Sequence, residues 1–268
     1  MILASIPSPP INLIEIGPLD IHFYGILIGF GVIVAMIITE RRYLRFGGNP
    51  ADVEKAAFWA VVIGFLGART AYVSTHFARF EGRFLHVFAI WEGGLAFFGG
   101  LTGGAIAAIW VMRRRKGDFP AFADAVAVGL PAAQAIGRFG NYFNQELFGT
   151  PTNLPWGLEI ARPFRPAEYV NSETFHPTFL YESLWNVGVI MILLAVERRF
   201  NLRRGSILLV YFMTYGVGRF LMELLRTDTT FRLFGISRNG WVSVAIVIGG
   251  AFGLWLRNRS RNEDLAAV

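Results

Sequence analysis

The chain has 268 residues, of which 54% are hydrophobic and 16% are charged, and its net charge is +6. Soluble domains usually carry about 25% charged residues, and disordered chains have low hydrophobicity, so the composition argues against both. The absence of cysteine excludes disulfides, thiolate metal sites and a cysteine nucleophile within the chain. The basic residues cluster between long apolar runs, which is typical of membrane-protein loops and not of a nucleic-acid-binding surface.

Seven stretches are long and apolar enough to cross a bilayer, which takes about 20 such residues. They predict an all-α polytopic membrane protein with seven transmembrane helices, in a single integral membrane domain over residues 1–268. The fourth stretch is the least apolar because it contains Asp124 and Gln134, and Pro131 is expected to kink it. The stretches cover about 22–40, 56–75, 93–112, 121–138, 178–196, 206–224 and 240–256.

Lysine and arginine are distributed unevenly over the connecting segments. Four alternate segments (41–55, 113–120, 197–205 and 257–268) hold 15 of the 25 basic residues, and the other four (1–21, 76–92, 139–177 and 225–239) hold 7. Positively charged loops stay in the cytoplasm, which predicts an external N-terminus and a cytoplasmic C-terminus. No basic residue precedes the first stretch, which argues against a cleavable signal peptide. The longest connection, 139–177, is predicted to be an external loop or head element.

The fourth stretch ends in a polar motif, GRFGNYFNQELFG. If the helix continues past Arg138, then Arg138, Asn141 and Gln145 share one helical face. An arginine at a helix end can also simply reach for the interface, but the density of polar groups at this membrane boundary favours a binding site. The polar members of the motif are Arg138, Asn141, Asn144, Gln145 and Glu146.

The sixth stretch contains Arg219 and Glu223, which are four residues apart and therefore neighbours on a helix. A buried structural ion pair is one interpretation. Arginine also forms bidentate contacts with phosphate and keeps its charge. Two membrane-embedded arginines from different helices, Arg138 and Arg219, are therefore predicted to converge on one pocket near the outer face, as a clamp for an anionic headgroup.

The third and fifth stretches open with further motifs. WEGGLAFFGGLTGG (91–104) has glycines spaced four apart, which favours tight helix packing, although such glycines can also expose backbone N–H groups to a ligand. HPTFLYE (176–182) places Glu182 within the membrane, where it should point into the bundle. Arg69 of the second stretch could pair with a carboxylate such as Glu182. His176 and His22, each considered alone, are expected to be structural residues at the interface.

Together these motifs resemble those of bacterial phosphatidylglycerol–prolipoprotein diacylglyceryl transferases. The resemblance runs from Tyr24 to about Asp228, and its most specific part is the motif that contains Arg138. It implies a multi-pass, seven-span enzyme of the cell (inner) membrane whose site opens outward, and the loop charges separately favour that orientation. The matching blocks are 91–104, 137–149, 176–182 and 215–226.

The resemblance implies transfer of a diacylglyceryl group from phosphatidylglycerol to the lipobox cysteine thiol of a prolipoprotein, with thioether formation and release of glycerol phosphate. The expected partners are phosphatidylglycerol, the prolipoprotein signal peptide and the lipid bilayer. No nucleic acid, cofactor or metal is expected, and no oligomeric state is predicted. A lipid or anion transporter that uses the same arginines as a headgroup site is the main alternative. A structural membrane protein with buried ion pairs is another.

The resemblance also implies roles for individual residues. The two arginines would hold the phosphate, Asn141 would orient headgroup oxygens and Glu223 would fix Arg219. Some family members have a histidine, proposed as the base, where this chain has Phe98. Either that role is not essential to the chemistry or another group supplies it, and His176, Glu146 and Tyr24 are the candidates by residue type. The expected catalytic residues are Arg138, Arg219, Tyr24, Glu146 and His176; the expected substrate-binding residues are Arg138, Asn141, Asn144, Gly149, Arg219 and Glu223.

Overall fold

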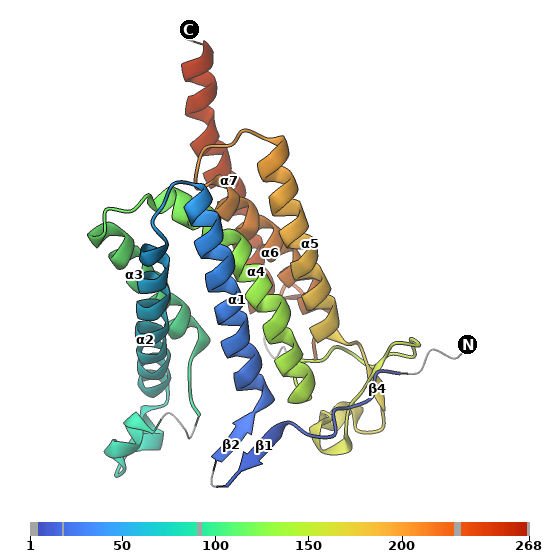
Figure 1. The fold of residues 1–268 in the computed structure, drawn as a ribbon. Coiled ribbons are helices and arrows are strands. Elements are labelled where there is room, and N and C mark those ends of the chain that lie inside the picture. Colours follow the sequence, from blue (N-terminus) through green and yellow to red (C-terminus); the bar gives the residue numbers. More distant parts are fainter. Residues whose placement is uncertain (1–4, 18, 90–92, 228–231, 267–268) are drawn as a thin grey trace. The chain divides into compact units, whose positions relative to one another are not determined.

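The computed structural model describes residues 5–17, 19–89, 93–227 and 232–266. Within them the chain is mainly helical (Figure 1), and each predicted stretch corresponds to one long helix. Trp91, Glu92 and Asp228, which the sequence analysis includes in its motifs, lie outside the described residues. The long helices are α1 (Phe23–Arg45), α2 (Pro50–Thr75), α3 (Phe97–Arg114), α4 (Phe119–Phe143), α5 (Thr178–Arg199), α6 (Ser206–Leu225) and α7 (Arg238–Ala266).

Six of these helices, all except α3, are long and apolar enough to cross a membrane. Helix α3 has 18 residues, four of them glycine, and ends in Arg113 and Arg114, which together lower its hydropathy. The described part of the chain therefore has the helix content of a multi-pass membrane protein.

The sequence analysis predicted no strands, but the described residues include three small antiparallel sheets. Their strands have two or four residues, too few for an alternating pattern to be recognised. The turn of the last hairpin has positive φ at Phe234 and Gly235, as a two-residue hairpin turn requires. The sheets pair β1 (Leu13–Ile16) with β2 (Leu19–His22), β3 (Leu158–Glu159) with β4 (Thr174–Phe175), and β5 (Arg232–Leu233) with β6 (Ile236–Ser237). Short 3₁₀ helices cover Phe77–Phe80, Phe84–Phe88, Arg162–Phe164 and Ala167–Tyr169.

The chain divides into two compact units, which are described separately below. One unit is Thr39–Ala125, and the other consists of the described residues before and after it. Whether both belong to a single integral membrane domain remains a prediction.

In the unit Thr39–Ala125, helices α2 and α3 pack closely through glycines. A Cβ atom added at Gly67 would lie 2.5 Å from the carbonyl oxygen of Gly99, and one at Gly103 would lie 2.6 Å from that of Ile63. Backbones this close leave no room for a side chain, so the glycine motif acts here in helix packing, the interpretation that its spacing favoured.

A Gly67→Ala variant tests this packing. We expect it to lower the free energy of unfolding by about 1–3 kcal/mol, because the added methyl group meets rigid backbone. Gly188→Ala in α5 is the control, since nothing lies within 4 Å of that position. Unfolding of the two variants in detergent, followed by circular dichroism, measures the difference, and equal stabilities would contradict the expectation.

Arg69 of α2 binds backbone carbonyls, and the expectation that a carboxylate such as Glu182 is its partner was wrong. Its guanidinium donates hydrogen bonds to the carbonyl oxygens of His86 (2.6 Å), Val87 (2.7 Å) and Gly93 (2.6 Å). The side chain is buried. Arg69 thus fixes the segment that leads from α2 to α3.

In the other unit, α4 is the most buried of the candidate spans. Of its most apolar stretch 61% is buried, whereas the other spans reach at most 33%. Protein around α4 shields its polar residues and Pro131 from lipid, which explains why the least apolar stretch is still a helix. The helix runs through Pro131 to Phe143.

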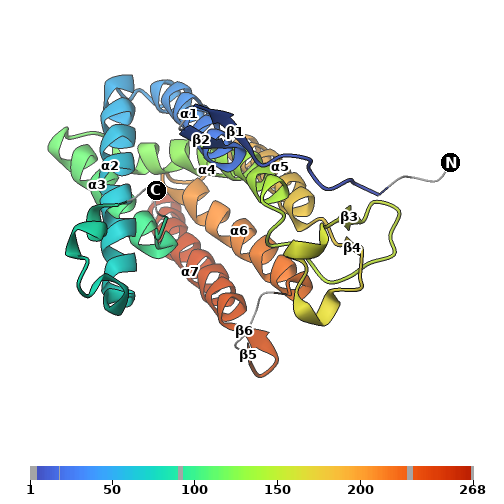
Figure 2. The ribbon, with the colours of Figure 1, turned by 90° about the horizontal axis from the view of Figure 1, so that it is seen from below.

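The core of this unit joins α4, α5 and α6, and α7 packs beside α6 (Figure 2). This packing brings the end of α4, the start of α5 and the last turns of α6 to the same end of the unit (Figure 1). The buried cluster consists of Ala127, Val128, Val189, Leu193, Ile207 and Tyr211.

Candidate active site

Two arginines from different helices meet at one carboxylate. Arg138 lies near the end of α4, Arg219 in α6 and Glu182 in the second turn of α5. The Nε atom of Arg138 is 2.5 Å from Oε2 of Glu182, and an Nη atom of Arg219 is 4.0 Å from Oε1 of the same residue. The two guanidinium groups therefore converge, and Glu182 bridges them. That they share a pocket stays a prediction, because neither arginine lines the cavity described below.

Arg219 has a second and closer acidic partner. Its other Nη atom is 2.6 Å from Oε2 of Glu223, one turn further along α6. The remaining oxygen of Glu223 accepts hydrogen bonds from Ser237 (2.8 Å) and Asn239 (3.3 Å). Glu223 is buried and held from two sides, so it fixes the orientation of the Arg219 side chain.

The polar motif after Arg138 extends the cluster outward. Arg138 donates a long hydrogen bond of 3.4 Å to Asn141, one turn along α4. The amide groups of Asn141 and Asn144 both donate to Oε1 of Glu146, at 2.9 and 3.3 Å. A continuous polar chain thus leads from the arginine pair to an exposed carboxylate.

Gln145 does not share the helical face of Arg138 and Asn141, contrary to the sequence prediction. Helix α4 ends at Phe143, and Gln145 has a φ of +50°. The turn points the side chain away from the cluster, where its Oε1 atom accepts a hydrogen bond of 2.7 Å from the backbone N–H of Ala161. Leu147 also has a positive φ, of +58°. Two non-glycine residues in this region mark a strained turn, as is common at functional sites.

Tyr24, at the start of α1, lies over this motif. A Cβ atom at Gly140 would be 2.5 Å from the Tyr24 ring, so the glycine makes room for the aromatic side chain. The structure therefore places Tyr24 against the last turns of α4, at Gly140 between Arg138 and Asn141.

Gly149 and His176 are in contact where residues 139–177, called the head below, lead into α5. The N–H of Gly149 donates to the carbonyl oxygen of His176, and a Cβ atom at Gly149 would lie 2.8 Å from His176 Cβ and 3.0 Å from the Leu225 carbonyl oxygen. Close packing of three segments thus requires glycine there. The His176 imidazole lies 3.3 Å from the Tyr181 hydroxyl, and among the described residues it makes no hydrogen bond with the arginine cluster.

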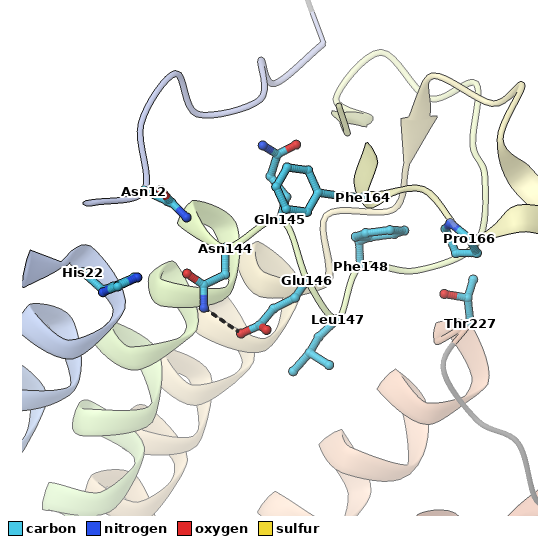
Figure 3. Close-up of a pocket in the computed structure, with 10 residues that line it drawn as sticks. All are labelled: Asn12, His22, Asn144, Gln145, Glu146, Leu147, Phe148, Phe164, Pro166 and Thr227. Carbon is cyan, nitrogen blue, oxygen red and sulfur yellow. Dashed lines mark hydrogen bonds between the residues drawn. The ribbon is translucent and has the colours of Figure 1, made fainter. Parts of the chain in front are cut away.

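A cavity of about 580 Å³ adjoins the outer end of the polar chain (Figure 3). The motif after α4 supplies half of its lining, and the rest comes from segments far away in the sequence. Among the residues that the structure describes, no group of three or more acidic or histidine side chains is arranged to hold a metal ion. The lining residues are Asn12, His22, Asn144, Gln145, Glu146, Leu147, Phe148, Phe164, Pro166 and Thr227.

Comparison with known proteins assigns the chain to one family. The model of the family described as prolipoprotein diacylglyceryl transferase matches residues 11–256, which include every residue of the cluster. The chain belongs to this family.

Several members of the transferase family are close relatives. The chain is 45% identical over 251 residues to the phosphatidylglycerol–prolipoprotein diacylglyceryl transferase of Cutibacterium acnes, a match that covers 92% of this chain and 84% of that protein. It is 43% identical over 253 residues to transferase 2 of Streptomyces coelicolor, with coverage of 93% and 80%. These identities confirm the family resemblance that the motifs indicated.

The sequence analysis of this transferase did not predict the partners of Glu182. Glu182 was expected to point into the bundle, but its place between the two arginines was not foreseen. The signal was present, since the sequence has two arginines and an acid at membrane depth near the same face. The partner choice depends on how three helices pack, which the sequence pattern does not specify.

Phe98, which stands where some family members have histidine, is the second residue of α3. Its side chain is exposed and its ring packs edge-on against Phe97. Phe98 belongs to the unit Thr39–Ala125 and the arginine cluster to the other unit. A phenyl ring accepts no proton, so Phe98 cannot act as a base, and either the reaction needs none at this position or another residue supplies it.

Proposed function

We propose that this chain transfers a diacylglyceryl group from phosphatidylglycerol to a cysteine thiol of a prolipoprotein. Both substrates appear in the names of its relatives. The observation that carries the proposal is the pair of arginines bridged by Glu182, because two guanidinium groups on separate helices suit a phosphodiester. The only anion of the lipid substrate is such a group.

The reaction is a displacement at carbon. The thiolate of the acceptor cysteine attacks the glycerol carbon that carries the phosphate ester, a C–S bond forms, and the C–O bond breaks with its electron pair on oxygen. The products are the thioether and glycerol phosphate. Fixed cations stabilise the charge that gathers on the leaving oxygen, an effect typically worth about 2.7–4 kcal/mol for one well-placed donor.

Six of the predicted site residues have a proposed part in binding the lipid or in holding the site together. Arg138 and Arg219 hold the phosphate, and Glu223 keeps Arg219 oriented. Asn141 lies between Arg138 and Glu146, where it can orient headgroup oxygens. Asn144 holds Glu146 from the other side, and Gly149 contributes by packing the head segment against the helices.

Glu146 is the best placed of the three candidate bases. Its carboxylate is exposed on the cavity and connected through Asn141 to the arginine pair. Tyr24 packs on Gly140 of the same motif and can support it, whereas His176 bonds to Tyr181. We therefore assign removal of the thiol proton to Glu146.

We further propose a seven-span topology in the cell (inner) membrane, with α3 as the seventh span, the N-terminus outside and the C-terminus cytoplasmic. The cluster lies next to segments 139–177 and 225–239. They belong to the set of connecting segments that holds 7 basic residues rather than 15, and basic loops stay in the cytoplasm, so this set is external. Residues 139–177 fold around β3, β4 and two 3₁₀ helices, in support of an external head.

The proposed activity is tested with the full chain in phosphatidylglycerol vesicles and a synthetic lipobox peptide. Transfer adds the mass of one diacylglyceryl group to the peptide and releases an equal amount of glycerol phosphate. A transporter would move lipid or anion across the vesicle membrane and leave the peptide unmodified. An unmodified peptide would overturn the proposed transfer.

A Glu182→Gln variant tests the bridge between the arginines. It removes the negative charge but keeps the size of the side chain, and we expect it to lower the free energy of unfolding by about 1–3 kcal/mol because two half-buried cations lose a partner. Glu173→Gln, the same change at an exposed position between α4 and α5, is the control. Unfolding of both variants in mixed micelles measures the effect, and an unchanged Glu182→Gln variant would contradict it.

A further inference from the structure

The cavity beside the arginine cluster is formed by four separate parts of the chain (Figure 3). Asn12 and His22 come from the segment before α1, residues 144–148 follow α4, Phe164 and Pro166 belong to the head, and Thr227 follows α6. Its volume of about 580 Å³ lies within the range of about 300–1,000 Å³ that ligand pockets have. The cavity is therefore large enough for a specific ligand.

The lining does not suit a phosphate group. None of its ten residues is lysine or arginine, and its one carboxylate, Glu146, would repel an anion. The cations of the site lie at the other end of the polar chain, on Arg138 and Arg219. The site thus has a cationic part, at Arg138 and Arg219, and a separate cavity whose only charged lining residue is Glu146.

Several polar side chains of the cavity have unused hydrogen-bonding capacity. Within the described part of the chain, no hydrogen bond engages the side chains of Asn12, His22 and Thr227. Phe148, Phe164 and Pro166 form an apolar wall among them. Amide, imidazole and hydroxyl groups next to apolar surface match an extended polypeptide, which offers backbone N–H and C=O groups and uncharged side chains.

We propose that this cavity binds the polypeptide substrate, through the uncharged segment next to its acceptor cysteine. The inference rests on the proposed function and identifies the site of its second substrate. Asn12, His22 and Thr227 bond to the peptide backbone, and the phenyl rings pack against its side chains. Glu146 lines the cavity and also bonds to Asn141, so the thiol enters beside the base, at the end of the polar chain that leads to the arginines.

Kinetics with both substrates varied test the assignment. Asn12→Ala and Thr227→Ala should each raise the KM for a lipobox peptide about three- to tenfold, the loss expected for one neutral hydrogen bond. The KM for phosphatidylglycerol and kcat should stay within about twofold of the parent values, because neither residue touches the arginines. Asn171→Ala, a change at an exposed residue that does not line the cavity, is the matched control.

Two kinetic results would overturn the inference. A higher KM for phosphatidylglycerol with an unchanged KM for the peptide would assign the cavity to the glycerol part of the lipid. Unchanged values for both substrates would show that the cavity binds neither. Absence of transfer by the parent chain would instead refute the proposed function, and the next experiment remains decisive in that case.

Disulfide cross-linking locates the peptide without turnover. The chain has no cysteine, so Thr227→Cys introduces a single thiol. Peptides with serine at the lipobox position and one cysteine at a neighbouring position should form a mixed disulfide with this variant under mild oxidation. Asn171→Cys should give little product, and equal yields from the two variants would contradict a peptide site in the cavity.

Discussion

An Arg219→Lys variant is expected to transfer lipid about 100-fold more slowly than the parent chain, the loss that follows removal of one well-placed electrostatic donor. Arg219 directs one Nη atom to Glu223 at 2.6 Å and the other towards Glu182 at 4.0 Å. A lysine ammonium is a point charge on a flexible stem and cannot serve two acids or a phosphate in this planar geometry. The initial rate of peptide lipidation in phosphatidylglycerol vesicles is the measurement.

The control for this experiment is Arg199→Lys, the same change at an exposed residue in the last turn of α5. It should leave the rate unchanged. Near-parental turnover by Arg219→Lys would show that positive charge alone is sufficient. The simultaneous contacts of the Arg219 guanidinium with Glu182 and Glu223 would then have no part in the reaction.

A Glu146→Gln variant is expected to lower kcat by about 100-fold or more, within the range that general base catalysis contributes. Glutamine keeps an oxygen that can accept from Asn141 and Asn144, but it cannot take a proton. The loss should therefore fall on proton removal and leave the polar chain to Arg138 in place. Measurement of kcat with saturating peptide and lipid isolates this step.

A more acidic acceptor separates the role of a base from a structural role. A peptide with selenocysteine in place of the acceptor cysteine is ionised at neutral pH, so it should restore much of the rate of the Glu146→Gln variant. Glu173→Gln, at an exposed position of the head, is the control and should react like the parent chain. A variant that stays slow with both acceptors would exclude Glu146 as the base.

Hydropathy predicted the positions of all seven long helices because the bilayer imposes one length and one polarity on any spanning segment. The fifth helix, expected at 178–196, is Thr178–Arg199, and the sixth, expected at 206–224, is Ser206–Leu225. Motif spacing also placed Arg219 and Glu223 together, since residues four apart on a helix are neighbours. These features depend on local geometry alone.

Features that depend on chain turns or on distant segments were not predictable. Gln145 left the expected helical face because α4 ends two residues earlier, and a strained turn at a loop has no clear sequence signal. Asn12 and Thr227 line one cavity although more than 200 residues separate them along the chain. Arg69 donates hydrogen bonds to backbone carbonyl groups. Every residue carries such a group, so no pattern of side chains in the sequence could identify the partners of Arg69.

The bridge at Glu182 has a consequence for how the site meets its lipid. Arg138 and Arg219 are balanced by Glu182 and Glu223, so the four formal charges cancel before any substrate arrives. With the carboxylate of Glu146 on the cavity, the site has no net positive charge, so dissolved phosphate or nucleotide anions are not drawn towards it. Capture then depends on headgroups that diffuse laterally within the leaflet, and the encounter rate should vary little with ionic strength.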